Sequence, residues 1–169
     1  MTSKAKTDEE IADECTFLGE ISGGRQMWLR PALFEQDHEA IENIAKQAKA
    51  CNPFLGKRFS SAAGYAAYSV RVLVDVEPDG VQRCVGFSCF EMKEEGEHAI
   101  FFLAVDELKQ RKGCGRALFE DIRDQGAPRR YTSTLPKTAA AGLAFSASLG
   151  FNENGQTARG GIRLRRDEW

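Results

Sequence analysis

The residues of this chain most suited to chemistry lie in the segment Gln110–Leu118, which has the sequence QRKGCGRAL. Two glycines, Gly113 and Gly115, stand between the apolar run Ala99–Val105 and a stretch in which apolar residues recur at helical spacing. Glycine allows unusual backbone dihedrals and close approach, and the first N–H groups of a helix have no partner inside it. Because the positive end of the helix dipole adds to these donors, such a turn favours the binding of a diphosphate.

Two familiar nucleotide motifs do not fit this segment. The GxGxxG fingerprint needs a third glycine, and the Walker pattern needs Gly-Lys followed by Ser or Thr, and the segment contains neither. Taken alone, a GxG turn between a strand and a helix is equally consistent with a tight turn that binds nothing. The choice between these two interpretations depends on the surrounding sequence.

The segment resembles the acetyl-CoA motif of the GNAT acetyltransferase superfamily, Q/R-x-x-G-x-G/A, with Gln110, Gly113 and Gly115 at its fixed positions. The resemblance includes the apolar strand before the motif. It also includes residues 144–151, AFSASLGF, which are similar to the last helix of the superfamily and its LGF ending. The residues before this region have a layout compatible with the same superfamily.

The resemblance implies that acetyl-CoA is the co-substrate. Its pyrophosphate would contact backbone amides of Arg111–Arg116, with Lys112 or Arg116 adding charge, although both side chains also suit a solvated surface. Its pantetheine arm would pair with the backbone near Leu103–Val105, where two parallel strands splay apart. The cofactor-binding residues expected on this basis are Leu103, Ala104, Val105, Gln110, Arg111, Lys112, Gly113, Cys114, Gly115 and Arg116.

Acyl transfer from a thioester to an amine needs a neutral amine, a polarised carbonyl and a protonated leaving thiolate. In the superfamily, a carboxylate near the start of the central strand commonly acts as base and a tyrosine of the last helix as acid. Here Ala99 and Ser146 stand at those two positions. The base candidates are Glu97, which shares a strand face with Ala99, and His98, which points away unless the strand has a bulge. Tyr131 and Ser146 are the proton-donor candidates, although Tyr131 also suits a half-buried strand aromatic and Ser146 a small helix-packing residue.

Hydrophobic periodicity predicts the order β-α-α-β-β-β-α-β-α-β-β, which mixes hairpins with a βαβ crossover. The predicted fold class is α/β (mixed α+β): a GNAT-like, mostly antiparallel sheet of about six to seven strands, with helices on both faces and a splayed central strand pair. The expected strands cover residues 26–33, 70–76, 84–92, 99–105, 131–135, 151–153 and 162–166, and the expected helices cover 35–49, 60–68, a segment just after Gly115, and 138–149.

The length and composition fit one soluble domain. The chain has 169 residues, of which 42% are hydrophobic and 28% charged. We expect a partly flexible leader over residues 1–24, with a short helix from Thr7 through Cys15, and a GNAT-like domain over residues 25–169. The polar start Met1–Glu10 and the lack of a long apolar run favour a cytoplasmic location without membrane contact.

Charge and cysteine spacing narrow the choice of partners. The net charge of −2 gives no global basic field for nucleic acid. The five cysteines form no CxxC pair, and with two histidines they show no zinc-ligand spacing, so we expect reduced structural thiols and no metal.

Three functions are compatible with the sequence. The first is an N-acetyltransferase that acts on a primary amine of a small molecule or protein, either as a monomer or as a homodimer. The second is a catalytically degenerate GNAT domain that binds acetyl-CoA as a sensor or interaction module. The third is a non-catalytic α/β domain that binds a partner and has a coincidental glycine turn.

Overall fold

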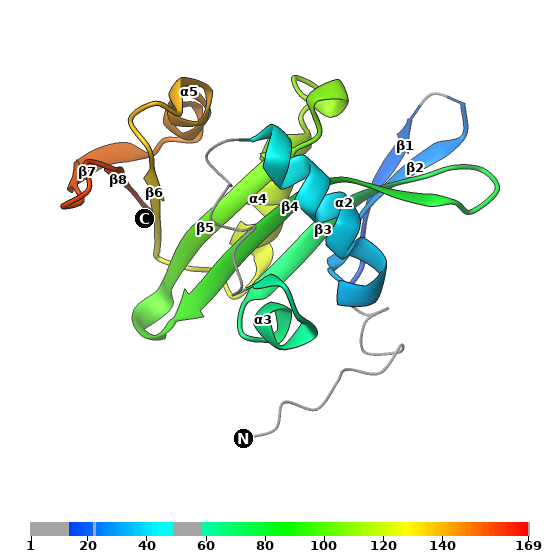
Figure 1. Cartoon of the computed structure of the whole chain (residues 1–169), viewed down its shortest axis with the longest axis horizontal. Helices are drawn as coiled ribbons and strands as arrows, with labels where there is room; N and C mark the ends of the chain where they lie inside the picture. Colours follow the sequence, from blue (N-terminus) through cyan, green and yellow to red (C-terminus); the bar gives the residue numbers. More distant parts are fainter. Residues whose placement is uncertain (1–13, 22, 49–58, 169) are drawn as a thin grey trace.

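The computed structural model of this protein describes residues 14–21, 23–48 and 59–168. These residues form one twisted sheet with helices against both of its faces (Figure 1). The predicted short helix from Thr7 through Cys15 lies outside the described residues except at Glu14 and Cys15, which are not helical. The strands are β1 (Thr16–Ile21), β2 (Arg25–Pro31), β3 (Ser69–Val76), β4 (Gln82–Lys93), β5 (Glu97–Val105), β6 (Arg130–Leu135), β7 (Asn152–Gln156) and β8 (Ile162–Asp167). The helices are α2 (Phe34–Gln47), α3 (Ala62–Ala66), α4 (Cys114–Asp124) and α5 (Ala140–Ser148), with short 3-10 turns η3 (Glu94–Gly96) and η4 (Glu107–Lys109).

The sheet order is β1-β2-β3-β4-β5-β6-β8-β7, and every neighbouring pair is antiparallel except β5 and β6. The predicted mixed, mostly antiparallel sheet is therefore confirmed. The described residues contain eight strands, whereas the sequence predicted six or seven. The additional strand, β1, lies in the segment interpreted as a leader. Its sequence, TFLGEI, lacks clear alternation, and its pairing with β2 is irregular between Phe17 and Gly19.

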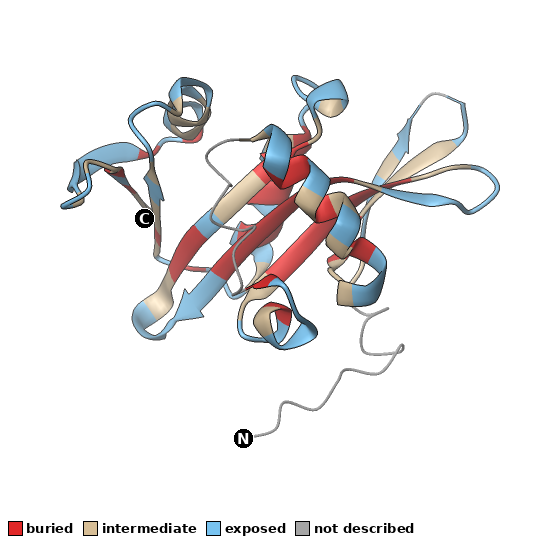
Figure 2. Ribbon diagram, in the orientation of Figure 1, coloured by how far each residue is buried: buried red, intermediate tan, exposed pale blue. Residues whose placement is uncertain are grey.

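Helices cover both faces of the sheet, as predicted, because the strand side chains alternate between two apolar layers. On one face, Ile41 and Ile44 of α2 pack with Val72 of β3 and Phe87 of β4. On the other face, Leu118 of α4 packs with the opposite side of the same strands. Buried residues accordingly concentrate in the central strands and on the inner sides of the helices (Figure 2). The core thereby fixes the positions of β5 and α4, which flank the glycine turn.

A buried ion pair joins α4 to the sheet. Arg71 of β3 donates from Nε and Nη2 to the two carboxylate oxygens of Asp121, each at 2.8 Å. Both side chains are almost fully buried, with exposed fractions of 4% and 2%. Bidentate geometry offsets much of the desolvation cost of such a pair. The pair sets the position of α4, and therefore that of its N-terminus, relative to β3.

We expect Arg71→Met to lower the free energy of unfolding by about 3–5 kcal/mol, because it leaves the Asp121 carboxylate buried without its partner. The double variant Arg71→Met/Asp121→Leu should recover most of this loss. The matched control is Arg83→Met, which removes an exposed pair with Glu77 and should cost less than about 1 kcal/mol. Urea denaturation measures all three. Equal losses in Arg71→Met and Arg83→Met would contradict a role for the buried pair.

Candidate functional site

The two parallel strands at the centre of the sheet pair over a short distance and then separate. Their pairing runs only from Glu97 opposite Arg130 to Ile100 opposite Ser133. Beyond that point β5 continues beside β4 to Val105, while β6 continues beside β8. The predicted splayed strand pair is therefore present, and among the described residues the β6 side of the second half of β5 has no strand partner.

A β-bulge lies at the point of separation. On β4, Cys89 and Phe90 are consecutive, but their partners on β5 are Phe102 and Ile100, so Phe101 is the extra residue. Bulges bend a strand and redirect its side chains. Phe101 is partly exposed, and its ring contacts Tyr68 edge to face with the ring centroids 5.4 Å apart. An aromatic pair thus lies beside the opening on the face that α3 covers.

The turn between β5 and α4, residues 106–113, is the β5–α4 loop. Arg111 and Gly113 both adopt the left-handed conformation, with φ of 61° and 82°. A Cβ at Gly113 would meet no atom within 4 Å, so the backbone is open to solvent there. α4 begins at Cys114, and the first N–H groups of a helix have no acceptor within it. The open backbone at Gly113 is thus continuous with the positive end of α4.

Side-chain hydrogen bonds hold the start of this loop. The Gln110 side chain donates from Nε2 to the Val105 carbonyl at 3.1 Å, which ties the first motif residue to the end of β5. Asp106 Oδ1 accepts from the Leu108 amide at 2.9 Å. The Glu107 amide donates to Gln47 Oε1 of α2 at 3.0 Å. The loop is therefore anchored to both a strand and a helix.

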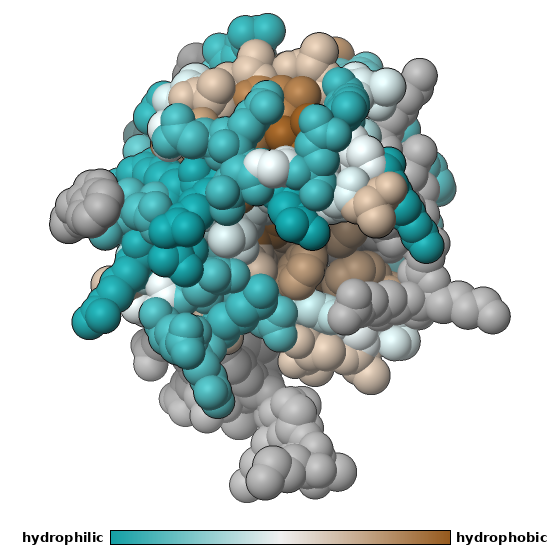
Figure 3. Space-filling model, turned by 90° about the vertical axis from the view of Figure 1, so that its left-hand side faces the viewer, coloured by the Kyte–Doolittle hydropathy of each residue, from teal (hydrophilic) through white to brown (hydrophobic). Residues whose placement is uncertain are grey.

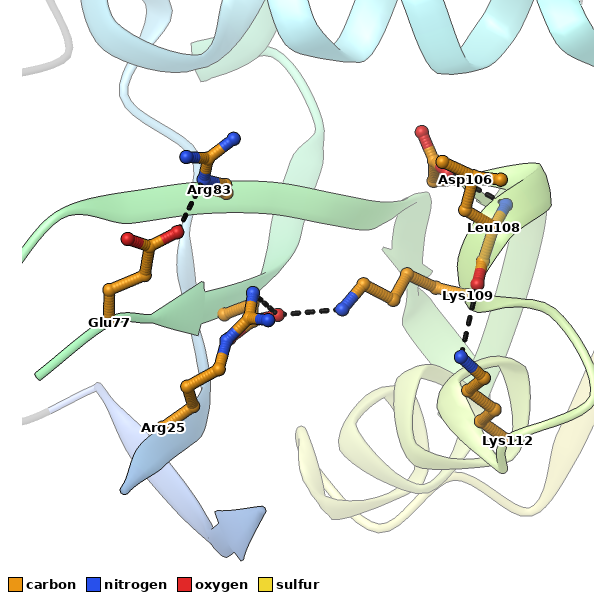
Figure 4. A network of polar contacts seen from close by, with 8 residues as sticks. Arg25, Glu77, Arg83, Asp106, Leu108, Lys109 and Lys112 are labelled. Carbon is orange, nitrogen blue, oxygen red and sulfur yellow. Dashed lines mark hydrogen bonds and ion pairs between the residues drawn. The ribbon is translucent and has the colours of Figure 1, made fainter. Parts of the chain in front are cut away.

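A second anchor comes from a buried carboxylate. Lys109 donates from Nζ to Asp75 Oδ2 at 2.8 Å, and Arg25 donates from Nε to Asp75 Oδ1 at 3.0 Å (Figure 4). Asp75 is fully buried in β3. Lys112 extends away from this network and donates to the Leu108 carbonyl at 3.2 Å (Figure 4). The anchored Lys109 restrains the loop, whereas the exposed Lys112 keeps donor capacity for a ligand.

Gly115 serves a different purpose from Gly113. A Cβ at Gly115 would lie 3.0 Å from Cζ of Phe145, so the ring of this α5 residue presses against the first turn of α4. The two regions that suggested the GNAT resemblance, the glycine motif and the last helix, are therefore in direct contact. Arg116, the last predicted cofactor residue, is exposed on the same turn.

Glu97 lies at the start of β5 among hydrogen-bond donors. Its Oε1 accepts from Thr132 Oγ1 at 3.0 Å and from Lys93 Nζ at 3.1 Å. Partial burial raises the pKa of Glu97, but the hydrogen bonds from Lys93 and Thr132 outweigh it, so the pKa lies below its usual value. Glu97 is thus an ionised carboxylate of low basicity at the first paired residue of β5, three residues before β5 and β6 separate. Thr132 was not a candidate from the sequence, since its partnership with Glu97 depends on the parallel register.

His98 points to the α4 face, as strand alternation predicts. It is buried, and its Nδ1 lies 3.2 Å from the Ile122 carbonyl. Desolvation lowers the pKa of His98, although this hydrogen bond partly raises it. The neutral ring donates its hydrogen bond to a helix carbonyl, which is a structural role. The ring therefore points away from Glu97.

Tyr131 is a core residue. Its side chain is fully buried, its ring packs against Phe119 and Phe151, and the Arg166 guanidinium lies 5.7 Å from the ring centroid. Its hydroxyl has no hydrogen-bond partner within the part of the chain that the structure describes. Burial raises the pKa of Tyr131 to about 12. These surroundings argue against a role as proton donor, and Tyr131 is more buried than the half-buried strand aromatic that the sequence offered as the alternative.

Ser146 lies on α5, next to Phe145, and is partly buried. It is therefore close in sequence to the residue that contacts the glycine motif. The side of the molecule formed by α5 and β6–β8 is mostly hydrophilic, with apolar groups over α5 and in a recess below it (Figure 3). Ser146 retains its predicted role as a proton-donor candidate.

Comparison with solved structures assigns the architecture. The PaiA N-acetyltransferase of Thermoplasma acidophilum, in complex with coenzyme A, matches with a TM-score of 0.67 at 12% identity, over 84% of this chain and 99% of that one. The ribosomal-protein-S18-alanine N-acetyltransferase of Escherichia coli matches with a TM-score of 0.58 at 22% identity, over 83% and 93% of the two chains. The putative acetyltransferase yncA of Salmonella typhimurium, with acetyl-CoA, gives 0.57 at 20% identity, again over 83% and 93%.

This chain has the GNAT fold. No family model and no curated protein matches the sequence. The GNAT fold thus rests on the arrangement of the elements, including the separated parallel strands and the turn that follows β5. Among the described residues, no group of three or more His, Cys, Asp or Glu side chains is placed to hold a metal ion. No helix in the same part of the chain is long and apolar enough to cross a membrane.

The lowered pKa of His98 predicts a pH effect on stability. Below its usual value of 6.5, an unfolded histidine takes up a proton that buried His98 does not yet bind, so the folded state loses stability as pH falls from 6.5 towards the folded pKa. We expect His98→Phe to remove this component. Urea titrations at pH 5 and pH 7.5 measure the free energy of unfolding of both proteins. The difference, wild type minus variant, should be smaller at pH 5 than at pH 7.5. A His98 ring resonance that titrates at or above pH 6.5 by NMR would contradict this interpretation.

Proposed function

We propose that this protein is an N-acetyltransferase that transfers the acetyl group of acetyl-CoA to a primary amine of a small molecule or protein. One observation carries the proposal: the unpaired edge of β5 leads directly to the open, left-handed backbone at Gly113 and to the N-terminus of α4. An extended amide-containing arm and a diphosphate are the chemical groups that these two surfaces complement.

The proposed cofactor contacts follow the loop geometry. The diphosphate would accept hydrogen bonds from backbone amides near Gly113, with positive charge supplied by Lys112 and Arg116. The pantetheine amides would pair with the edge of β5 at Leu103 and Ala104. The Val105 carbonyl already accepts a bond from Gln110, so the groove would begin before that residue.

The base of the reaction is proposed to be Glu97. It is ionised and lies on the paired part of β5 and β6, three residues before the two strands separate. A water molecule between Glu97 and the ammonium group of the acceptor would relay the proton to the carboxylate. The neutral amine then attacks the thioester carbonyl and the C–S bond breaks. The extra proton on the attacking nitrogen passes to the departing thiolate, and the Ser146 hydroxyl is the candidate relay for this proton.

A specific observation favours the alternative, an acetyl-CoA sensor without transferase activity. Ser146 stands where the superfamily commonly has a tyrosine, and the phenol of Tyr131, the other proton-donor candidate, is enclosed in the core. Without a strong proton donor, such a domain would still bind acetyl-CoA at the β5–α4 loop but would not transfer the acetyl group.

Gly113→Val tests the cofactor site. A β-branched residue is strained at a φ of 82° and places methyl groups over the open backbone, so we expect acetyl-CoA to bind at least about tenfold more weakly by calorimetry. Gly80→Val is the matched control. Gly80 has a φ of 87° and an equally open surrounding in the turn between β3 and β4. Equal losses of binding in both variants, or no binding by the wild type at millimolar acetyl-CoA, would refute the proposed site.

Glu97→Gln tests catalysis, measured as release of free coenzyme A with a panel of polyamines, amino acids, aminoglycosides and peptides. A general base contributes about 10²–10⁴-fold, so kcat/KM should fall by at least about 100-fold. Lys93→Met is the companion variant, because Lys93 helps to lower the Glu97 pKa. Its loss should move the acidic limb of the kcat/KM profile to higher pH. A wild-type rate in Glu97→Gln would exclude Glu97 as base, and tight cofactor binding without turnover of any amine would favour the sensor.

A further inference from the structure

A cavity of about 210 Å³ lies between β1 and the first turn of α4. It includes Lys112, Gly113 and Cys114 in its wall, whereas the neighbouring Gly115 faces Phe145 of α5. The remaining wall comes from β1, β2, β3 and Ala117 of α4. The cavity is thus separate from the opening between β5 and β6, and the β5–α4 loop lies between the two.

The interior of this cavity is apolar. Leu18 and Ile21 of β1 line it together with Met27 of β2 and Leu73 of β3. Leu18 and Ile21 are 42% and 39% exposed, so β1 leaves apolar surface uncovered at an edge of the sheet. A ligand with a hydrocarbon chain would remove this surface from water, which is favourable in proportion to the area buried.

The size of the cavity limits the ligand. A volume of 210 Å³ corresponds to about seven water molecules at the volume that each occupies in the liquid. Such a space suits a ligand of roughly eight non-hydrogen atoms. The candidates are therefore short-chain metabolites with one polar end.

The charges around the cavity favour a negative polar end. Lys112 donates to the neutral Leu108 carbonyl and forms no ion pair among the described residues. Arg25 and Lys109 share the single buried carboxylate of Asp75, which leaves an excess of positive charge (Figure 4). Glu20 and Lys112 both line the cavity and are both exposed, so solvent screens their charges to a similar extent. The excess positive charge comes from Arg25 and Lys109 around Asp75.

We propose that this cavity binds a small amphiphilic carboxylate. The alkyl chain lies against Leu18, Ile21 and Leu73, and the carboxylate lies beside Lys112 at the N-terminus of α4. The combination of a mostly apolar wall with an ammonium group and a helix N-terminus at one end is the recognition chemistry for this class of ligand.

Binding at this cavity also regulates the cofactor site, and this second part rests on the proposed function. The carboxylate and the diphosphate of acetyl-CoA both use Lys112 and the positive end of α4, from opposite sides of the same loop. Each ligand therefore lowers the affinity for the other by the same factor.

The test of the cavity uses the full-length, ¹⁵N-labelled chain without acetyl-CoA, titrated with hexanoate and followed by NMR. We expect saturable shifts at the amides of Gly19, Gly113 and Ala117. Hexylamine, with the opposite charge, should bind at least about tenfold more weakly. Ala117→Phe fills the cavity and should abolish saturation, whereas Ala147→Phe, on the exposed side of α5, should retain it.

A second variant covers the case in which Ala117→Phe fails to fold. Ile21→Glu places a negative charge at the exposed rim and should weaken hexanoate about tenfold. The cavity proposal is overturned if the wild type shows no saturation at tens of millimolar hexanoate, if hexylamine binds equally well, or if a folded variant of either kind binds like the wild type.

Calorimetry with acetyl-CoA tests the regulation. Saturating hexanoate should weaken acetyl-CoA about fivefold, and acetyl-CoA should weaken hexanoate by the same factor. Unchanged or tighter acetyl-CoA binding would overturn the regulatory part. If acetyl-CoA does not bind at all, the proposed function fails, and the hexanoate titration still decides on the cavity by itself.

Discussion

The structure is organised around the separation of two strands that begin as hydrogen-bonded neighbours. β5 and β6 part after Ile100 because each then follows its other neighbour, β4 or β8. Backbone N–H and C=O groups are strong hydrogen-bonding groups that must find partners, in protein, water or ligand. Where the ladder between β5 and β6 ends, β5 therefore presents a row of backbone N–H and C=O groups that have no strand partner among the described residues. The surrounding strands and helices hold this row in a fixed position. The bulge at Phe101 and the loop after Val105 form the two ends of this row.

The β5–α4 loop is ordered by contacts that need no ligand. Gln110 attaches it to β5, Gln47 attaches it to α2, and the buried Asp75 attaches it through Lys109 to β3. Arg71 and Asp121 fix the helix that follows. A loop held in this way loses little conformational entropy when a ligand binds, so more of the interaction energy appears as affinity. The left-handed residues can then present their amides in one fixed arrangement.

The sequence predicted most of the elements but less of the site. Strict alternation in Val70–Val76 and the continuous apolar run before Val105 specified β3 and β5, since these strands lie where periodicity is strongest. β1 was missed because its pattern is broken by Gly19 and a register irregularity. Strand alternation also gave the opposite orientations of Glu97 and His98.

Other features of the site depend on three-dimensional packing. The contacts of Glu97 with Thr132, and of Lys109 with Asp75, join residues far apart in the chain, so no local spacing indicated them. Tyr131 is buried because its ring packs against Phe119 of α4 and Phe151, which directly precedes β7. Periodicity alone does not reveal such packing. The parallel register of β5 and β6 decides which of these side chains meet.

The contact between Gly115 and Phe145 has a consequence for how this sequence can change over time. The motif of the GNAT superfamily that this segment resembles accepts either Gly or Ala at this position, but in this chain an Ala methyl would lie 3.0 Å from the Phe145 ring. A drift to Ala would require the ring to move by a few tenths of an ångström or to be replaced by a smaller side chain. Positions 115 and 145 should therefore vary together among descendants of this sequence, with the size of one residue setting the size of the other.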